Sequence, residues 1–226
     1  MFIGHYAMGM AAKKMDPKLS LGTTFLASQL LDLLWPLFLL WGFEKVEIEP
    51  GNTLFTPLNF VSYPFSHSLV AALVWALVLG AIYYSVKKNQ KGAVLLALLV
   101  ISHWVLDYVT HRPDLPLSFS QETKVGLGLW NNKIMTILIE VFLLAAGCYL
   151  YITATQTKNR IGNLALWGFI LFIVIIYFFN VFGPPPPSTE AIPYAGFAQW
   201  LFIIWGYWID HNRSTVTPSL STSHKV

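Results

Sequence analysis

The sequence predicts an all-α integral membrane protein, a helical bundle of six transmembrane helices preceded by a short N-terminal helix. Two observations carry this prediction. Of the 226 residues, 55% are hydrophobic and only 11% are charged, whereas a soluble domain carries about 25% charged residues. The apolar residues also fall into runs of about 20 residues, which is the length that a helix needs to cross a bilayer.

Six apolar runs reach this length, and they are taken here in chain order. They cover residues 19–43, 64–86, 92–109, 134–154, 163–182 and 192–209. A seventh stretch, residues 2–10, is apolar but too short to cross. We expect a single transmembrane domain over residues 1–212, followed by a Ser/Thr-rich cytoplasmic tail, residues 213–226, that is disordered.

The basic residues predict the orientation of the bundle. Cytoplasmic loops carry an excess of Lys and Arg. With six spans, ten of the 14 basic residues fall on one side, and four, Lys45, Arg112, Lys124 and Lys133, fall on the other. We therefore expect a multi-pass protein of the inner or plasma membrane with both termini in the cytoplasm.

Several function classes find no support in the sequence. The single cysteine, Cys148, lies inside an apolar run, so neither an intrachain disulfide nor a cysteine metal cluster is expected. Lys13 and Lys14 follow the first apolar stretch, whereas a signal peptide carries its charges first. We find no Gly-rich phosphate loop, no Gly-x-Ser-x-Gly motif and no basic patch, and hence expect no nucleic-acid partner.

One polar motif stands at the end of the third apolar run. His103, Asp107 and His111 are spaced four apart, so they lie on one face of a helix. A charged side chain at membrane depth costs several kcal/mol unless it has a partner. A metal ion is a partner that suits imidazole and carboxylate alike, and hydrogen-bonded pairs that join helices are the alternative. His111 precedes Arg112 and Pro113, so it is either a ligand or an outer-surface residue.

Four further ionisable residues lie in or near apolar runs: His5, Asp32, His67 and Glu140. At 1.5 Å per helical residue, Asp32 and His103 lie about 20 and 18 Å above the cytoplasmic lysines. Asp32, His67 and Glu140 therefore share a band with the motif in the outer half of the bilayer. His5 reaches that band from below if the N-terminal piece is re-entrant. Glu140 is a candidate proton carrier, or else a partner of Lys133.

The order of these residues resembles a known family. His5, Asp32, Ser66-His67-Ser68 and Ser102-His103-x-x-x-Asp107 follow the pattern of the DUF457-type membrane-bound metal-dependent hydrolases, which are similar to zinc-dependent phospholipase C and P1 nuclease. The resemblance covers residues 5–107. It implies one zinc held by Asp32, His67, His103 and Asp107, and a second held by His5, with Asp107 bridging. The third-metal His-x-x-x-Glu pair of the soluble phospholipases corresponds here to Thr136 and Glu140, without the His.

The leading hypothesis is therefore a membrane-embedded hydrolase of a phosphoester, with membrane lipid around it and a lipid-like substrate. One or two zinc ions, or manganese or iron in their place, would activate a water. The candidate catalytic residues are Asp32, Asp107 and Glu140. The candidate metal ligands are His5, Asp32, His67, His103, Asp107 and His111.

Two other hypotheses stay open at this stage. In an ion- or proton-coupled transporter or channel, the same intramembrane Asp, His and Glu residues would relay protons or bind a cation transiently. In a non-catalytic structural protein, they would join helices to one another. The sequence does not specify an oligomeric state or a particular substrate.

Overall fold

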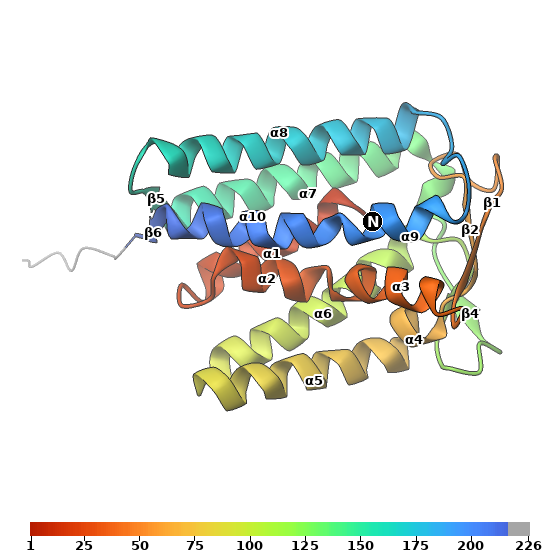
Figure 1. Cartoon of the computed structure of the whole chain (residues 1–226), viewed down its shortest axis with the longest axis horizontal. Helices are drawn as coiled ribbons and strands as arrows, with labels where there is room; N and C mark the ends of the chain where they lie inside the picture. The colour runs from red at the N-terminus through yellow and green to blue at the C-terminus, as the bar shows by residue number, and fades with distance from the viewer. Residues whose placement is uncertain (217–226) are drawn as a thin grey trace, which may run out of the picture.

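Helices make up most of the chain, as the sequence predicts. The computed structural model describes residues 1–216, and 67% of these residues are helical. Helices run side by side along the long axis of the molecule (Figure 1). The long helices are α5 (Leu69–Lys87), α6 (Gln90–Thr110), α7 (Lys133–Ala154) and α8 (Arg160–Phe182).

The described residues support four or five membrane spans, against the predicted six. Four helices, α5 to α8, are long and apolar enough to cross a membrane, and a fifth span is formed if α2 (Leu21–Ser28) and α3 (Leu30–Leu40) count as one. These two helices are bent by 56° at Gln29. The apolar run at 192–209 is divided into α9 (Ala191–Phe197) and α10 (Gln199–His211), each too short to count alone, so six spans are not confirmed.

Apolar side chains outside the bundle fit a membrane environment. Leu77, Phe142 and Leu164 are each more than 70% exposed although they lie within long helices. In water such a surface would be costly, whereas in a bilayer it faces hydrocarbon. The chain is therefore a multi-pass membrane protein rather than a soluble helical bundle.

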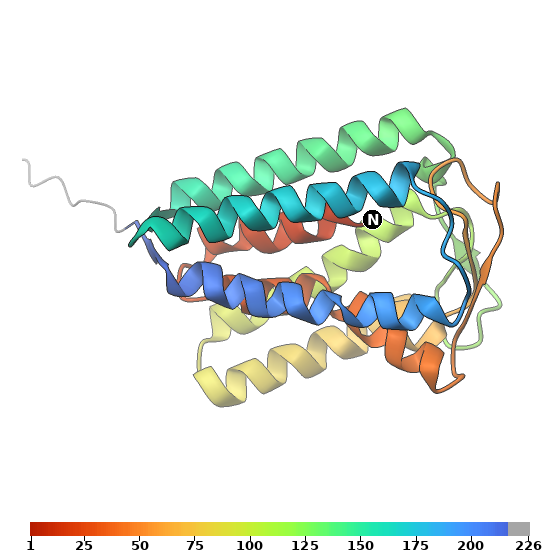
Figure 2. The same ribbon diagram turned by 45° about the horizontal axis from the view of Figure 1, so that its top comes forward.

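The N-terminal helix α1 (Ile3–Met15) lies inside the bundle. It begins at the middle of the molecule and runs to one end between its neighbours (Figure 2). Its closest neighbour is α7, where a Cβ on Gly147 would collide with the backbone oxygen of Ala7. The absence of a side chain at Gly147 lets the two backbones approach closely, as small residues do between membrane helices.

Short strands occupy both ends of the bundle and were not predicted. One end, here the β1–β4 end, carries two antiparallel pairs and α4. Its elements are β1 (Lys45–Ile48), β2 (Leu58–Ser62), α4 (Pro64–His67), β3 (Leu115–Pro116), β4 (Lys124–Val125) and the 3₁₀ turn η1 (Leu129–Asn131). The opposite end carries β5 (Thr155–Thr157) paired with β6 (Arg213–Thr215).

The strand β6 lies beyond residue 212, where the sequence predicts that the domain ends. Residues 213–215 were expected in the disordered tail, but Arg213 is buried and its Nε donates a hydrogen bond to Thr155 Oγ1 at 3.0 Å. The ordered domain therefore continues past residue 212 because the Arg213 side chain packs between the ends of two helices. The remainder of the expected tail, residues 217–226, lies outside the described residues.

Candidate metal centre

Helix α6 carries the centre of the candidate site. The side chain of Asn89 caps the start of α6 by accepting a hydrogen bond from Gly92 N at 3.1 Å, and Pro113 stands just beyond its end. His103 and Asp107 are buried on one face, and His103 Nε2 lies 3.1 Å from Asp107 Oδ2. The predicted four-residue spacing thus places both side chains together.

The bent pair α2–α3 supplies two further groups. The main-chain oxygen of Ser28 is 2.8 Å from His103 Nδ1. Since a carbonyl only accepts, Nδ1 carries the proton and Nε2 of His103 presents its lone pair to the cluster. Asp32 lies in the first turn of α3, and its Oδ1 is 3.7 Å from His103 Nε2.

Helix α4 presents His67 through a chain of hydrogen bonds. His67 Nε2 lies 3.3 Å from Asp32 Oδ1, and His67 Nδ1 lies 2.7 Å from Ser66 Oγ. Ser66 Oγ donates its proton to Glu44 Oε2 at 2.7 Å, so it accepts the Nδ1 proton of His67. The Nε2 of His67 therefore faces Asp32 with a free lone pair, as metal-binding imidazoles do.

Glu44 is a supporting residue that the sequence interpretation did not select. Its Oε1 accepts hydrogen bonds from the backbone nitrogens of Phe65 and Ser66, both at 2.8 Å. Burial raises the pKa of Glu44, while these hydrogen bonds act in the opposite direction. The sequence places Glu44 in an acidic loop segment, and no spacing connects it with His67, so only the folded chain reveals the contact.

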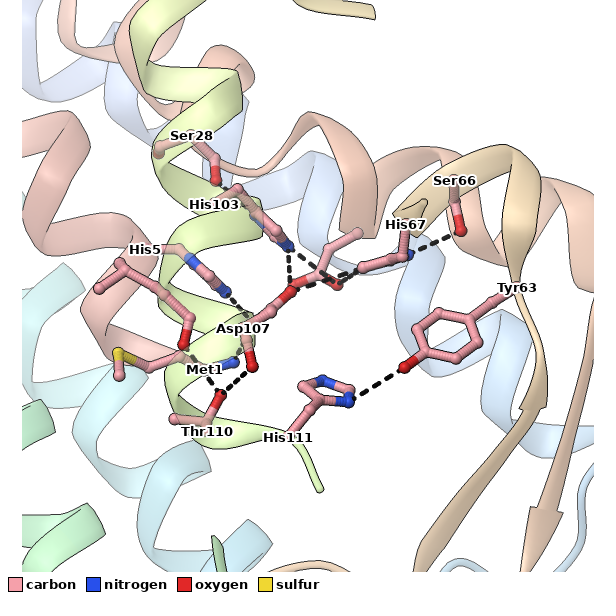
Figure 3. Close-up of polar contacts among 12 residues, drawn as sticks. Met1, His5, Ser28, Tyr63, Ser66, His67, His103, Asp107, Thr110 and His111 are labelled. Carbon is pink, nitrogen blue, oxygen red and sulfur yellow. Dashed lines mark hydrogen bonds and ion pairs between the residues drawn. The ribbon is translucent and has the colours of Figure 1, made fainter. Parts of the chain in front are cut away.

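Helix α1 brings His5 to the cluster from the other side. His5 Nε2 lies 3.0 Å from Asp107 Oδ1, and the His5 ring stacks on His103 with centroids 3.6 Å apart. The α-amino nitrogen of Met1 also lies 2.6 Å from Asp107 Oδ1. The two oxygens of Asp107 thus face different imidazoles, Oδ1 toward His5 and Oδ2 toward His103 (Figure 3).

These side chains form two groups of potential ligands that share His103. One group is His5, His103 and Asp107, and the other is Asp32, His67 and His103, with the ligand atoms of each group within 4.8 Å of one another. Buried His103 Nε2 makes no well-formed hydrogen bond in spite of its short distance to Asp107. No Lys or Arg side chain among residues 1–216 pairs with Asp32 or Asp107.

The donor set is of a kind that could hold a metal ion. Imidazole and carboxylate donors together suit zinc, and also manganese or iron. Two neighbouring carboxylates at membrane depth require positive charge. The α-amino group of Met1 supplies one positive charge beside Asp107, and a divalent ion would supply the remainder. His103 Nε2 is buried close to both carboxylates and has no hydrogen-bond partner, as is expected of a nitrogen that would bind a metal ion.

Glu140, a candidate catalytic residue, lies outside both groups. Its Oε2 accepts hydrogen bonds from Phe2 N at 2.9 Å and Gly4 N at 3.2 Å, and it is buried. These amides are among those that an α-helix leaves unpaired at its start. Glu140 therefore fixes the beginning of α1, and with it His5, and makes no contact with Asp32 or Asp107 in the described part of the chain.

His111, a candidate ligand, also lies outside both groups. Its Nδ1 is 3.0 Å from Asp114 Oδ1 and 3.2 Å from the hydroxyl oxygen of Tyr63. Burial alone would raise the pKa of Asp114, but hydrogen bonds from His111, Tyr63 and Arg112 hold that pKa below its usual value. The structure thus pairs His111 with an acid that follows α6 rather than with the cluster.

A cavity of about 930 Å³ connects these two regions. Asp32, His67, Asp107 and His111 are among its lining residues. Most of the other wall is apolar, with side chains of Phe55, Tyr177 and Phe202 and the four consecutive prolines at 184–187. The cluster is therefore reached through a space whose wall is mostly apolar and also includes the polar residues Lys133, Asn180 and Gln199.

Fold and site together define a multi-pass helical membrane protein with a buried cluster of histidines and aspartates. The model of a family described as YdjM inner membrane protein matches residues 1–183. The chain belongs to this family. None of the curated proteins and none of the solved structures compared with the chain gives a significant match.

Proposed function

We propose that this protein is a metal-dependent hydrolase of a phosphoester, embedded in the inner membrane. The observation that carries the proposal is the convergence of His5, Asp32, His67, His103 and Asp107 on one point beside a cavity. The relation to zinc-dependent phospholipase C and P1 nuclease, which the order of these residues suggests, is part of the same proposal.

The proposal assigns each side chain of the cluster to one of two zinc ions. Asp32, His67 and His103 would hold one zinc ion, and His5 with Asp107 would hold a second, one oxygen of Asp107 facing each side. A bound zinc ion supplies an electrophile that acidifies water and neutralises phosphate charge. The protein itself holds the imidazole tautomers through Ser28 and Ser66 and keeps bulk water away by burial.

The lining of the cavity supports the proposal that the substrate is amphiphilic. The cluster forms one part of its wall and most of the remaining wall is apolar, so a phosphate group and a hydrocarbon chain would each meet matching surface. A phosphoester of membrane lipid type therefore fits better than a small hydrophilic one. The excess of basic residues at the β5–β6 end further supports a cytoplasmic position for that end, with the cluster toward the outer leaflet.

Metal content and turnover of the purified protein test this proposal. We expect about one or two zinc ions per chain after purification without chelator, and zinc-dependent release of phosphate or phosphoalcohol from lipid vesicles. His103→Ala should abolish both, whereas His211→Ala, which changes an exposed histidine of α10, should leave both unchanged. Full zinc content in His103→Ala would refute the metal site, and zinc without any turnover would favour a transporter or a structural role.

A further inference from the structure

Arg112 and Lys124 line a second pocket, at the β1–β4 end of the bundle. Its volume of about 390 Å³ lies within the range of about 300–1,000 Å³ that is typical of ligand sites. Arg112 follows the end of α6 at Thr110, and Lys124 belongs to β4 (Figure 1). Because α6 is one of the candidate spans, the pocket lies where the chain leaves the membrane.

Hydrogen bonds fix both basic side chains in place. Arg112 Nε donates to Asp114 Oδ2 at 3.1 Å, and Arg112 Nη2 donates to Asn59 Oδ1 at 2.6 Å. Lys124 Nζ donates to the main-chain oxygen of Val61 at 3.1 Å. Asn59 and Val61 both belong to β2, so the two cations are tied to one strand. A side chain that is already held in place loses less conformational entropy when an anion binds to it.

These contacts leave donors on both cations without an acceptor. A guanidinium has five N–H groups and an ammonium has three. Among residues 1–216, Arg112 Nη1 makes no hydrogen bond, and Lys124 Nζ makes only the bond to Val61. Among the described residues that line the pocket, Asp114 is the one carboxylate, and Arg112 pairs with it. The charge of Lys124 therefore remains in excess.

Exposed aromatic side chains indicate that lipid surrounds this end of the bundle. Trp41, Phe43, Phe65 and Phe119 are all exposed, and each ring contacts the next, with centroids 6.1, 6.2 and 5.9 Å apart. Aromatic residues gather at the depth of the lipid headgroups. Phe119 lies in the loop between β3 and β4, and Lys124 begins β4. The hairpin that carries Lys124 is therefore expected at the depth where lipid phosphate groups lie.

We propose that the pocket of Arg112 and Lys124 binds the phosphate group of an anionic membrane lipid. The free N–H groups of Arg112 would donate to the phosphate oxygens, and Lys124 would supply the second positive charge. The pocket shares Phe60 with the wall of the larger cavity, but none of the residues of the histidine and aspartate cluster lines it. The site requires neither zinc nor turnover, so this inference does not depend on the proposed function.

Lipid binding by the full-length protein tests the proposal. Native mass spectrometry in a nonionic detergent counts bound lipid, with phosphatidic acid and phosphatidylglycerol as anionic probes and phosphatidylcholine as a probe without net charge. We expect both anionic lipids to bind more tightly than phosphatidylcholine. Lys124→Gln and Arg112→Gln should each weaken the binding of phosphatidic acid by about fivefold, which is the effect of one basic residue near a membrane surface. Lys124→Gln keeps the test open if Arg112→Gln does not fold.

Lys45→Gln is the matched control, because Lys45 lies at the same end, pairs with Glu47 at 2.6 Å and does not line the pocket. It should bind phosphatidic acid as the unchanged protein does. An equal loss in Lys45→Gln, or unchanged binding in Lys124→Gln, would overturn the proposal.

Inorganic phosphate as a competitor distinguishes the two sources of a phosphate group. We expect it to displace phosphatidic acid only weakly. Tighter binding of inorganic phosphate than of phosphatidic acid, lost in Lys124→Gln, would assign the pocket to free phosphate and overturn the lipid as its ligand. None of these measurements uses turnover, so a failure of the proposed hydrolase leaves the result on this pocket unchanged.

Discussion

The imidazole rings of His5 and His103 stack face to face, with their centroids 3.6 Å apart and their planes within 5° of parallel. The two residues come from α1 and α6, which are more than 80 residues apart in sequence. Both rings direct Nε2 to the carboxylate of Asp107, one to each oxygen. Two histidines on opposite oxygens of one carboxylate form an arrangement that two bridged metal ions would use.

This stacking leads to a prediction about metal number. His5→Ala removes a ligand from only one of the two groups, so we expect zinc content to fall from about two ions per chain to about one. His103→Ala removes a ligand of the other ion and also the ring on which His5 stacks, so both ions should be lost. Elemental analysis of detergent-purified protein measures this. Retention of both ions in His5→Ala would show that α1 does not contribute a ligand.

Glu140 is predicted to act through the position of α1 rather than through proton transfer. Glu140→Leu leaves the amides of Phe2 and Gly4 without an acceptor, which costs about 1–3 kcal/mol for each buried group. Glu140→Gln keeps an oxygen at that place. We therefore expect thermal unfolding and zinc analysis to show a large loss of stability and of one zinc ion in Glu140→Leu, and a small loss of either in Glu140→Gln.

The opposite pattern would contradict this role. If Glu140→Gln loses turnover as completely as Glu140→Leu while both keep their zinc, the carboxylate takes part in proton transfer, as the sequence interpretation suggested. If neither variant changes stability, the contacts with Phe2 and Gly4 do not hold α1 in place.

The sequence identified five residues that meet, but it did not separate them from two that do not, and it did not show how each one is held. His5, Asp32, His67, His103 and Asp107 stand out because ionisable residues are rare in apolar runs, and all five lie together in the structure. Glu140 and His111 stand out for the same reason and yet lie outside the cluster. Depth along a helix predicts the level of a side chain in the membrane, whereas its direction depends on how neighbouring helices are rotated.

Two apolar runs show what hydropathy does not predict about the fold. Hydropathy predicts the long helices α5 to α8 well, because each is a continuous apolar run. It does not show that the first run bends by 56° at Gln29 or that the last run divides at Ala198. Apolar composition is equal on both sides of such a break, so no change of pattern marks it. The bend matters for the site, because Ser28 and Asp32 lie on its two sides.

The chain of hydrogen bonds from Glu44 through Ser66 to His67 predicts an effect on zinc affinity. Ser66→Ala removes the acceptor for the Nδ1 proton of His67, and substitutions of this kind typically cost about 10–100-fold in metal affinity. Zinc competition with a chelator dye measures the change. Ser68→Ala provides the comparison, since the Ser68 hydroxyl caps α5 through Ala71 N and makes no hydrogen bond to the His67 ring. Equal affinity in Ser66→Ala and the unchanged protein would remove Ser66 from the site.

The close approach of α1 and α7 predicts a strong effect of one methyl group. Gly147→Ala would place a Cβ against the backbone oxygen of Ala7, and backbone does not move aside as a flexible side chain does. We expect a loss of about 1–3 kcal/mol in the free energy of unfolding, together with weaker binding of the zinc ion that depends on His5.

Gly168→Ala in α8 is the matched control, because its Cβ would lie 3.5 Å from a Trp205 side-chain atom, an ordinary contact. Removing a helical glycine there should be neutral or stabilising by up to about 1 kcal/mol. Thermal unfolding and zinc titration of the two variants in the same detergent measure both effects. If Gly147→Ala matches Gly168→Ala in both, α1 does not depend on this contact for its place beside Asp107.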